Sequence, residues 1–167
     1  MIQEALRRLV RRENLSEREA AEAVGEIFSG TVPEALTGAF LAALAAKGET
    51  VEELAGAARA MRRHAARIQV TAPAVVDTCG TGGDGRGTFN ISTTTAFVVA
   101  GCGVTVAKHG NRSVTGRCGS ADLVEALGVR LEAPLEVVEE ALAAIGIGFL
   151  FAPRHHGAMK HAAPVRR

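Results

Sequence analysis

The stretch Val75-Val-Asp-Thr-Cys-Gly-Thr-Gly-Gly-Asp-Gly-Arg-Gly-Thr-Phe-Asn-Ile-Ser92 holds five glycines between Gly80 and Gly87, directly after a short apolar run. Glycine lets backbone N–H groups approach a ligand without interference from Cβ, and the N-terminus of a following helix adds partial positive charge. The stretch therefore predicts a strand, a phosphate-binding loop and a helix, in that order. A flexible turn with ordinary helix caps at Asn90 and Ser92 is the alternative interpretation.

Short β-branched runs alternate with helical runs through the remainder of the chain. In order they are VVDTC (75–79), STTTAFVVAG (92–101), VTVAK (104–108), SADLVEALG (120–128), VRL (129–131), PLEVVEEALAAIG (134–146) and GFLFA (148–152). This βαβαβαβ order predicts a parallel sheet flanked by helices. The expected fold class is therefore α/β, in a domain that spans residues 70–167.

The first 69 residues predict a small all-helical domain. Ser16 and Thr50 each begin a capping box, which Glu19 and Glu53 close. Pro33 suits a first helical turn, Gly30 and Gly48 suit helix ends, and Pro73 suits a hinge between the domains. The expected helices span roughly 2–13, 16–29, 33–47 and 50–67.

Composition narrows the classes of partner. The net charge is +1 and 47% of the 167 residues are hydrophobic, so no global field favours nucleic acid or an anionic membrane. The three cysteines form no CxxC pair, which favours reduced thiols over a zinc site. With no signal peptide and no long apolar stretch in this sequence, the expected location is the cytoplasm.

The glycine loop has to be compared with two other glycine-rich motifs that bind phosphates. Gly80 to Gly85 matches GxGxxG, but the second strand ends in Lys108 rather than in the acidic residue that a dinucleotide-binding fold needs. No Walker A motif is present. A second loop of similar chemistry, residues 108–120, also follows a strand, and adjacent parallel strands would present both loops at one edge of the sheet.

Several motifs together resemble the anthranilate phosphoribosyltransferase family. They are Asp77-Thr-Cys-Gly-Thr-Gly-Gly-Asp84, Asn90-Ile-Ser-Thr93, Lys108-His-Gly-Asn-Arg112, Gly119-Ser-Ala-Asp122 with Glu125-Ala-Leu-Gly128, and Gly148-Phe-Leu-Phe-Ala-Pro153 through Pro164-Val-Arg166. The resemblance covers the whole chain but only about the first half of the family's usual length. It implies a small helical domain, through which the family commonly forms homodimers, and an α/β domain of the nucleoside-phosphorylase type (class III phosphoribosyltransferase), here truncated at its C-terminus.

The resemblance also implies the reaction. Enzymes of the family transfer a phosphoribosyl group from 5-phosphoribosyl 1-pyrophosphate (PRPP) to anthranilate, releasing pyrophosphate in tryptophan biosynthesis. Because positive charge develops on the ribosyl carbon as pyrophosphate leaves, catalysis requires positioning and leaving-group stabilisation rather than a protein nucleophile. No catalytic residue is therefore expected beyond those that bind the substrates.

Residue by residue, the resemblance places PRPP contacts at both loops. These are Gly80, Gly83, Asp84, Thr88, Asn90, Ile91, Ser92, Thr93, Lys108, His109, Gly110, Asn111, Arg112, Ser113, Val114, Thr115, Gly116 and Ser120. Lys108 and Arg112 are expected to supply charge. Ser92 is the expected Mg²⁺ contact, and Mg²⁺ typically keeps waters and substrate phosphates as further ligands.

The anthranilate contacts implied by the family are Gly80, Asn111 and Arg166, whose guanidinium suits a carboxylate. His155, His156 and His161 invite a metal interpretation, but no neighbouring Cys or carboxylate completes a ligand set, so a substrate-lining histidine is preferred. The family often has proline where this chain has Gly157. His64 is expected at the surface.

Two alternatives remain at this point. Pyrimidine nucleoside phosphorylases share the architecture, although their second loop normally reads Lys-His-Ser. A non-catalytic homologue that binds nucleic acid would need a broad basic surface, whereas here the charge is confined to two loops. The acidic Mg²⁺ ligands that the family has further along its chain have no equivalent in this sequence, so the 167 residues alone are expected to be inactive.

Overall fold

The computed structural model describes residues 1–80, 89–113 and 118–166, with the side chain of Arg166 outside the described set. Tertiary contacts divide the chain into two compact units. The helical unit comprises residues 1–66 and 156–167, and the sheet unit comprises residues 67–155. In the described ranges, no helix is both long and apolar enough to cross a bilayer.

Four α-helices form the body of the helical unit: α1 (Ile2–Val10), α2 (Glu17–Phe28), α3 (Glu34–Lys47) and α4 (Val51–His64). Both expected capping boxes are confirmed. Ser16 Oγ accepts from the Glu19 N–H at 3.3 Å, and the Glu19 carboxylate accepts from the Ser16 N–H at 2.8 Å. Thr50 and Glu53 repeat this exchange at 3.3 and 2.8 Å. Two helix starts are thus set by residues close in sequence.

The helix ends follow backbone conformation. Gly30 and Gly48 adopt φ of +76° and +88°, as expected for residues that end helices. Helix α1 ends at Val10, three residues earlier than predicted, because Arg12 adopts φ of +62° and the Glu13 N–H donates back to the Arg8 carbonyl. This turn resembles a Schellman motif without glycine, which the sequence pattern did not reveal.

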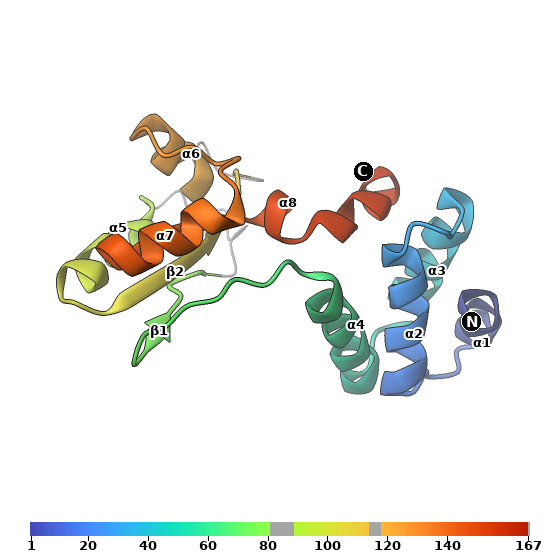
Figure 1. Cartoon of the computed structure of the whole chain (residues 1–167). Helices are drawn as coiled ribbons and strands as arrows, with labels where there is room; N and C mark the ends of the chain where they lie inside the picture. The colour runs from blue at the N-terminus through green and yellow to red at the C-terminus, as the bar shows by residue number, and fades with distance from the viewer. Residues whose placement is uncertain (81–88, 114–117, 167) are drawn as a thin grey trace. The chain divides into compact units, whose positions relative to one another are not determined.

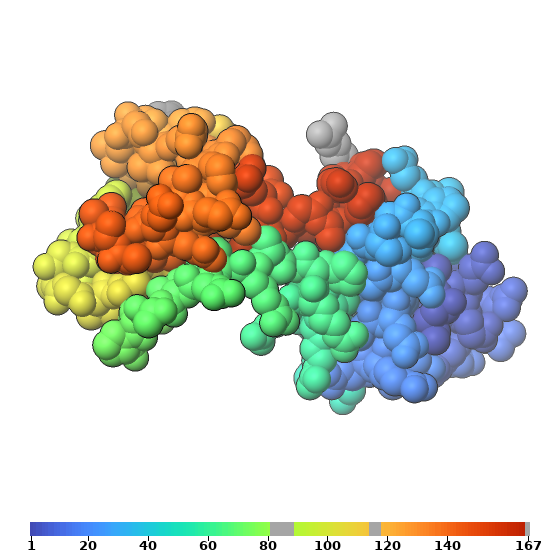
Figure 2. Space-filling view, in the orientation of Figure 1, coloured from blue at the N-terminus to red at the C-terminus, as the bar shows by residue number. Residues whose placement is uncertain are grey.

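The core of the helical unit also takes in the C-terminus. Phe40 and Ala23 are fully buried, and Leu9 is 1% exposed. The short 3₁₀ helices η1 (Gly157–His161) and η2 (Ala163–Arg166) contact α2 and α3 respectively, and Ala162 belongs to this core. Figures 1 and 2 show this segment in red beside the blue helices. Contacts therefore group residues 156–167 with the helices, although the sequence analysis assigned them to the α/β domain.

A buried ion pair connects three parts of the helical unit. Glu53 is 1% exposed and its carboxylate accepts from Lys47 Nζ at 2.9 Å and from the Leu15 N–H at 2.9 Å. Lys47 Nζ also donates to Asn14 Oδ1 and to the Gly48 carbonyl. Burial works to raise the pKa of Glu53, but the hydrogen bonds from Leu15, Lys47 and Thr50 outweigh it and hold that pKa below its ordinary value.

Replacing Lys47 by Met should destabilise the helical unit by about 3–5 kcal/mol, because it leaves the buried Glu53 carboxylate without its cation. Chemical denaturation followed by circular dichroism measures this change. Arg7→Met, which breaks the exposed pair with Glu4, is the matched control and should change stability by less than about 0.5 kcal/mol. Equal losses of unfolding free energy for the two substitutions would show that the buried pair stabilises the unit no more than the exposed pair does.

Three parallel strands form the sheet of the sheet unit: β1 (Val75–Val76), β2 (Thr105–Gly110) and β3 (Ile147–Phe151), in the order β1-β2-β3. Val75 pairs with Thr105, and Val106 pairs with Ile147, so β2 is central. The α/β class and the parallel order are confirmed. Helix α5 (Ile91–Gly101) connects β1 to β2, and α6 (Ser120–Ala126) and α7 (Leu135–Ile145) lie between β2 and β3 in sequence (Figure 1).

The two faces of β3 pack against different helices. Phe149 and Phe151 join Ala121 and Val124 of α6 in one apolar cluster. Leu150 joins Val138 and Leu142 of α7 in another. Because successive strand residues point to opposite faces, α6 covers one face of β3 and α7 covers the other.

The prediction of a strand at VRL (129–131) is wrong. Gly128 adopts φ of +94° and the Val129 N–H donates to the Val124 carbonyl, so this stretch completes the end of α6. Leu131 is buried, but in the cluster with Phe151 rather than in the sheet. The apolar alternation reflected packing against a strand and not pairing with one.

Candidate phosphate-binding site

The carboxyl ends of β1 and β2 lie side by side and are joined by Asp77. Its Oδ1 accepts from the His109 N–H at 3.2 Å and from the Cys79 N–H at 3.0 Å. Thr78 Oγ1 donates to the Ser92 carbonyl at 2.7 Å. The residues that follow β1 are therefore fixed both to the end of β2 and to the first turn of α5.

The N-terminus of α5 has no side-chain cap. Asn90 occupies the N-cap position, but its side chain makes no capping hydrogen bond, and its Nδ2 lies 3.5 Å from Cys118 Sγ. The alternative interpretation of Asn90 as an ordinary cap is therefore wrong. The Ile91 and Thr93 N–H groups donate to the Phe89 and Asn90 carbonyls, but without a side-chain cap among the described residues the partial positive charge of this 11-residue helix is left for an anion.

Lys108 is a buried cation at the same edge. It is 3% exposed, and its Nζ donates to the His109 carbonyl at 3.2 Å. Among the residues that the structure describes, no carboxylate lies within ion-pair distance of Lys108. A buried ammonium with a single carbonyl partner is costly unless an anion joins it, so Lys108 and the start of α5 together favour phosphate.

The second loop begins with residues that contact the first turn of α6. The Asn111 carbonyl accepts from the Ala121 N–H at 3.1 Å and from Ser120 Oγ at 3.3 Å. Gly110 has no room for a side chain, because a Cβ there would meet Ser120 Oγ and the Phe149 ring. Residues Gly110 and Asn111 of the motif Lys108 to Arg112 thus lie next to Ser120.

The guanidinium of Arg112 forms ion pairs with two carboxylates of α6. Its guanidinium donates to Asp122 Oδ1 at 2.9 Å and, by two hydrogen bonds of 2.7 and 2.9 Å, to the Glu125 carboxylate. These bonds raise the pKa of Arg112 and lower that of Glu125. The pKa of Asp122 is lowered first by hydrogen bonds from the Gly119 and Ser113 N–H groups and then by Arg112. Arg112 therefore differs from Lys108, although the sequence analysis gave them one role.

Several predicted site residues lie outside the described set, namely Gly83, Asp84, Thr88, Val114, Thr115 and Gly116. The structure brings Asn90, Ser92, Thr93, Lys108, His109, Gly110, Asn111 and Ser120 to the ends of β1 and β2 or to the helices that follow. Gly80 follows β1 and is exposed. Arg166 belongs to the helical unit, in η2.

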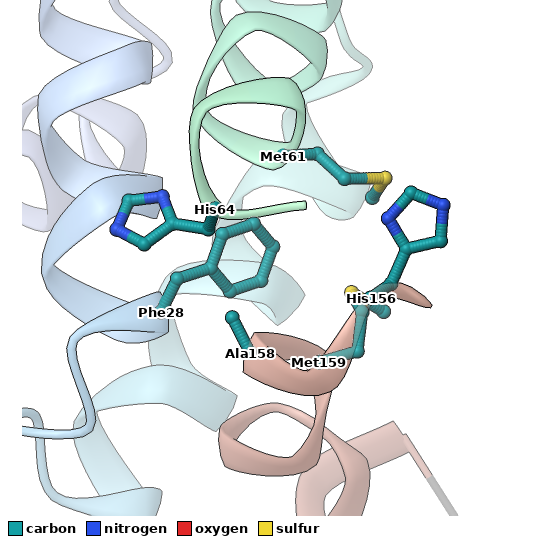
Figure 3. Close-up of a pocket in the computed structure, with 6 residues that line it drawn as sticks. All are labelled: Phe28, Met61, His64, His156, Ala158 and Met159. Carbon is teal, nitrogen blue, oxygen red and sulfur yellow. The ribbon is translucent and has the colours of Figure 1, made fainter. Parts of the chain in front are cut away.

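The histidines near the C-terminus have separate surroundings. His155, in α8 (Ala152–His155), has its ring centroid 6.0 Å from that of His109. His156 lines a small surface hollow in the helical unit with Phe28, Met61, His64, Ala158 and Met159, and Figure 3 shows the Phe28 ring between His64 and His156. His161 lies against Gly30. Within the described ranges, no group of three or more His, Cys, Asp or Glu side chains could hold a metal ion.

Two residues with clear roles at this edge were not assigned as site residues from the sequence. Asp77 holds the ends of β1 and β2 together, and Asp122 accepts from the Ser113 and Gly119 N–H groups at 3.1 and 2.8 Å. Both lie inside quoted motifs. A carboxylate directly after a strand, or three residues into a helix, is the local signal that would have indicated them.

Thr93 carries a buried hydroxyl without a partner. It is 1% exposed, and its Oγ1 finds no hydrogen-bond partner among the described residues. Replacing Thr93 by Val should raise the free energy of unfolding of the sheet unit by about 1–3 kcal/mol, because an unsatisfied polar group is removed at constant shape. If the hydroxyl serves a bound phosphate, affinity should fall at the same time.

Denaturation and calorimetric titration with PRPP measure the two effects of Thr93→Val. The control is Thr95→Val, which removes an exposed hydroxyl bonded to the Ile91 carbonyl at 2.9 Å and should change stability by less than about 0.5 kcal/mol. A Thr93→Val protein less stable than the control would contradict the assignment.

The pKa of His155 is lowered, first by burial and then by the charge of His109, from its ordinary value of 6.5. The unfolded chain therefore takes up this proton before the folded one as pH falls. The sheet unit should keep the full contribution of His155 above pH 6.5 and lose it between 6.5 and the lowered pKa. Urea unfolding across this range should show the slope, and His155→Gln should remove it.

Proton NMR titration gives a direct check on His155. Its ring should titrate below 6.5, and His109→Gln should move the midpoint upward because a neighbouring positive charge is lost. A midpoint at or above 6.5 in the unaltered protein would contradict the prediction.

Comparison with known proteins first defines the class. Residues 72–167 match the model of a glycosyl transferase family, a/b domain, and residues 3–65 match that of a glycosyl transferase family, helical bundle domain. The chain belongs to this glycosyl transferase family. The two matches agree with a helical part followed by a parallel α/β part.

The relatives then narrow the class. The chain is 70% identical over 167 residues to an anthranilate phosphoribosyltransferase of Syntrophobacter fumaroxidans, and 62% identical to one of Desulfosudis oleivorans. All of this chain is covered, but only 50% and 49% of those relatives. The chain thus spans about half the length of the curated relatives that it matches.

Solved structures agree with these relatives. The anthranilate phosphoribosyltransferase of Thermus thermophilus is 49% identical with a TM-score of 0.88, covering 97% of this chain and 49% of that one. The Saccharomyces cerevisiae enzyme in complex with PRPP and Mg is 29% identical with a TM-score of 0.87, covering 99% and 50%. The nucleoside-phosphorylase-type fold expected from the sequence is therefore shown.

Proposed function

We propose that this chain carries the PRPP site of an anthranilate phosphoribosyltransferase, which transfers the phosphoribosyl group from PRPP to anthranilate in tryptophan biosynthesis. The relatives at 70% and 62% identity bear that name, and the yeast enzyme holds PRPP and Mg. Dimerisation through the helical unit stays a prediction from the resemblance, and a cytoplasmic location stays a prediction from the sequence pattern.

The single observation that carries the proposal is the pairing of a buried cation with an uncapped helix. Lys108 is 3% exposed without a carboxylate partner among the described residues, and α5 begins without a side-chain cap. Lys108 lies near the end of β2, and α5 follows the neighbouring parallel strand β1. Phosphate groups bind at such edges because backbone N–H groups and fixed positive charge converge there.

The described residues offer one candidate Mg²⁺ ligand at this site. Ser92, in the first turn of α5, offers a hydroxyl of the kind that a hard cation accepts, and the described residues assemble no larger ligand group. Ser92 would therefore be one protein ligand, with substrate oxygens and water as the others. A bound Mg²⁺ would neutralise part of the pyrophosphate charge.

The protein's own residues contribute to transfer by binding and orientation. Lys108 and the N–H groups at the start of α5 stabilise the charge that grows on the departing pyrophosphate. Asp77 and Thr78 tie residues 77–79 to the end of β2 and to the first turn of α5, and this fixed edge would orient the phosphates for attack by the anthranilate amine. In this proposal Asn111 binds the acceptor, and the assignment of Arg166 to the acceptor stays a prediction from the resemblance.

Lys108→Met tests the proposal. The unaltered chain should bind PRPP in the presence of Mg²⁺, and the variant should bind about 10- to 150-fold more weakly, because hydrogen bonds to charged groups contribute ~1.5–3 kcal/mol. Titration calorimetry measures both affinities. Because a buried charge is removed, the variant's melting temperature should not fall.

The matched control is Lys160→Met, which removes an exposed lysine of the helical unit and should leave PRPP affinity within about twofold. Failure of the unaltered chain to bind PRPP, or unchanged affinity in Lys108→Met, would refute the proposed site.

A further inference from the structure

One carboxylate joins the two ends of the loop that the resemblance assigns to PRPP. Asp122 Oδ2 accepts from the Ser113 N–H at 3.1 Å and from the Gly119 N–H at 2.8 Å. A Cβ on Gly119 would meet the backbone of Arg112 and Ser113, so the two chain segments are in close contact. Residues 111–113 and 118–120 are thus fixed relative to each other by a side chain of α6.

The other oxygen of Asp122 belongs to an ion-pair cluster. Arg112 Nη1 donates to Asp122 Oδ1 at 2.9 Å and to Glu125 Oε2 at 2.7 Å, and Nη2 donates to Glu125 Oε1 at 2.9 Å. The guanidinium carbon lies 5.9 Å from the centroid of the Phe151 ring. The bidentate hydrogen bonds to the Glu125 carboxylate and the face of the Phe151 ring together define one orientation of the Arg112 guanidinium.

This arrangement leaves Arg112 no simple role as a phosphate ligand. Its single positive charge faces two carboxylates, and three of its hydrogen bonds would have to break before it reached a polyphosphate. Asp122 in turn is an anion beside the start of a loop that should attract an anion. The pairing with Arg112 removes that conflict, because a neutralised carboxylate no longer repels phosphate.

We propose that Asp122 is a positioning residue for PRPP, that Arg112 holds and neutralises it, and that neither side chain contacts the substrate. The inference rests on the proposed function. Asp122 sets the geometry of residues 111–113 and 118–120, which include the predicted contacts Asn111, Ser113 and Ser120. Glu125 fixes Arg112 but has no further part in binding.

The substitution Asp122→Asn should change PRPP affinity in opposite directions, depending on whether Asp122 positions the loop ends or acts only through its charge. Neutralising a carboxylate near a polyphosphate would strengthen binding if only charge mattered. The inference expects PRPP affinity to fall about 5- to 100-fold, because the amide cannot accept at both oxygen positions and one loop end is released. In hydrogen exchange, the Ser113 or Gly119 amide should lose protection while the rest of the sheet unit keeps it.

A double-mutant cycle tests whether Arg112 neutralises Asp122 and Glu125 or instead binds PRPP directly. Arg112→Gln should weaken PRPP binding by a similar factor, since Asp122 and Glu125 then repel each other and the phosphates. Glu125→Gln alone should leave affinity within about twofold, yet in the Arg112→Gln background it should restore about fivefold or more. If Arg112 instead contacted PRPP, Glu125→Gln would release the guanidinium. PRPP binding would then become stronger, but only in the protein that retains Arg112.

The experiment is calorimetric titration of the 167-residue chain and its variants with PRPP and Mg²⁺, with melting temperatures to show that each variant is folded. Arg130→Gln, an exposed arginine of the sheet unit, controls for the loss of one positive charge. No binding by the unaltered chain would refute the proposed function. Normal binding by the unaltered chain, with stronger binding in Asp122→Asn or no rescue of Arg112→Gln, would overturn this inference alone.

Discussion

Parallel pairing of β2 with both of its neighbours is the constraint on which the sheet unit depends. Because β1, β2 and β3 run in one direction, their carboxyl ends meet at one edge, and the segments after them are brought together. Asp77 after β1 then accepts a hydrogen bond from the His109 N–H near the end of β2. A one-residue change of register would turn Lys108 to the opposite face of the sheet.

The same edge uses its charges in two ways. Lys108 is buried beside a carbonyl and without a carboxylate partner among the described residues, so its charge is left for an anion. Arg112, four residues later, is held by Asp122 and Glu125. In the proposed site, binding and positioning are thus divided between two cations of one motif, and local neutralisation of the carboxylate removes its repulsion of phosphate.

The helical unit depends on contacts between distant segments. The buried Glu53 joins the chain before α2 to the end of α3 and the start of α4. Residues of η1 and η2, more than ninety positions from α4 in sequence, pack on α2 and α3 and complete the same core. A C-terminal segment that carries Arg166 is in this way fixed to helices rather than to the sheet.

The sequence by itself determined whatever depends on neighbours along the chain. Capping boxes, glycine helix ends and the parallel α/β order are local patterns, and each predicted an element that the structure confirms. The glycine-rich motifs indicated the family to which the relatives belong. The two phosphate-binding loops were expected at one edge because adjacent parallel strands leave no other arrangement.

Only the tertiary structure decided which partners those residues find. A strand and a buried turn have the same apolar spacing over three residues, so VRL was misread until the packing of Leu131 on Phe151 was visible. Arg112 and Lys108 are both cations in one motif, and nothing local shows that α6 brings two carboxylates to the first and none to the second. The packing of η1 and η2 on the helices likewise depends on contacts between segments far apart in sequence.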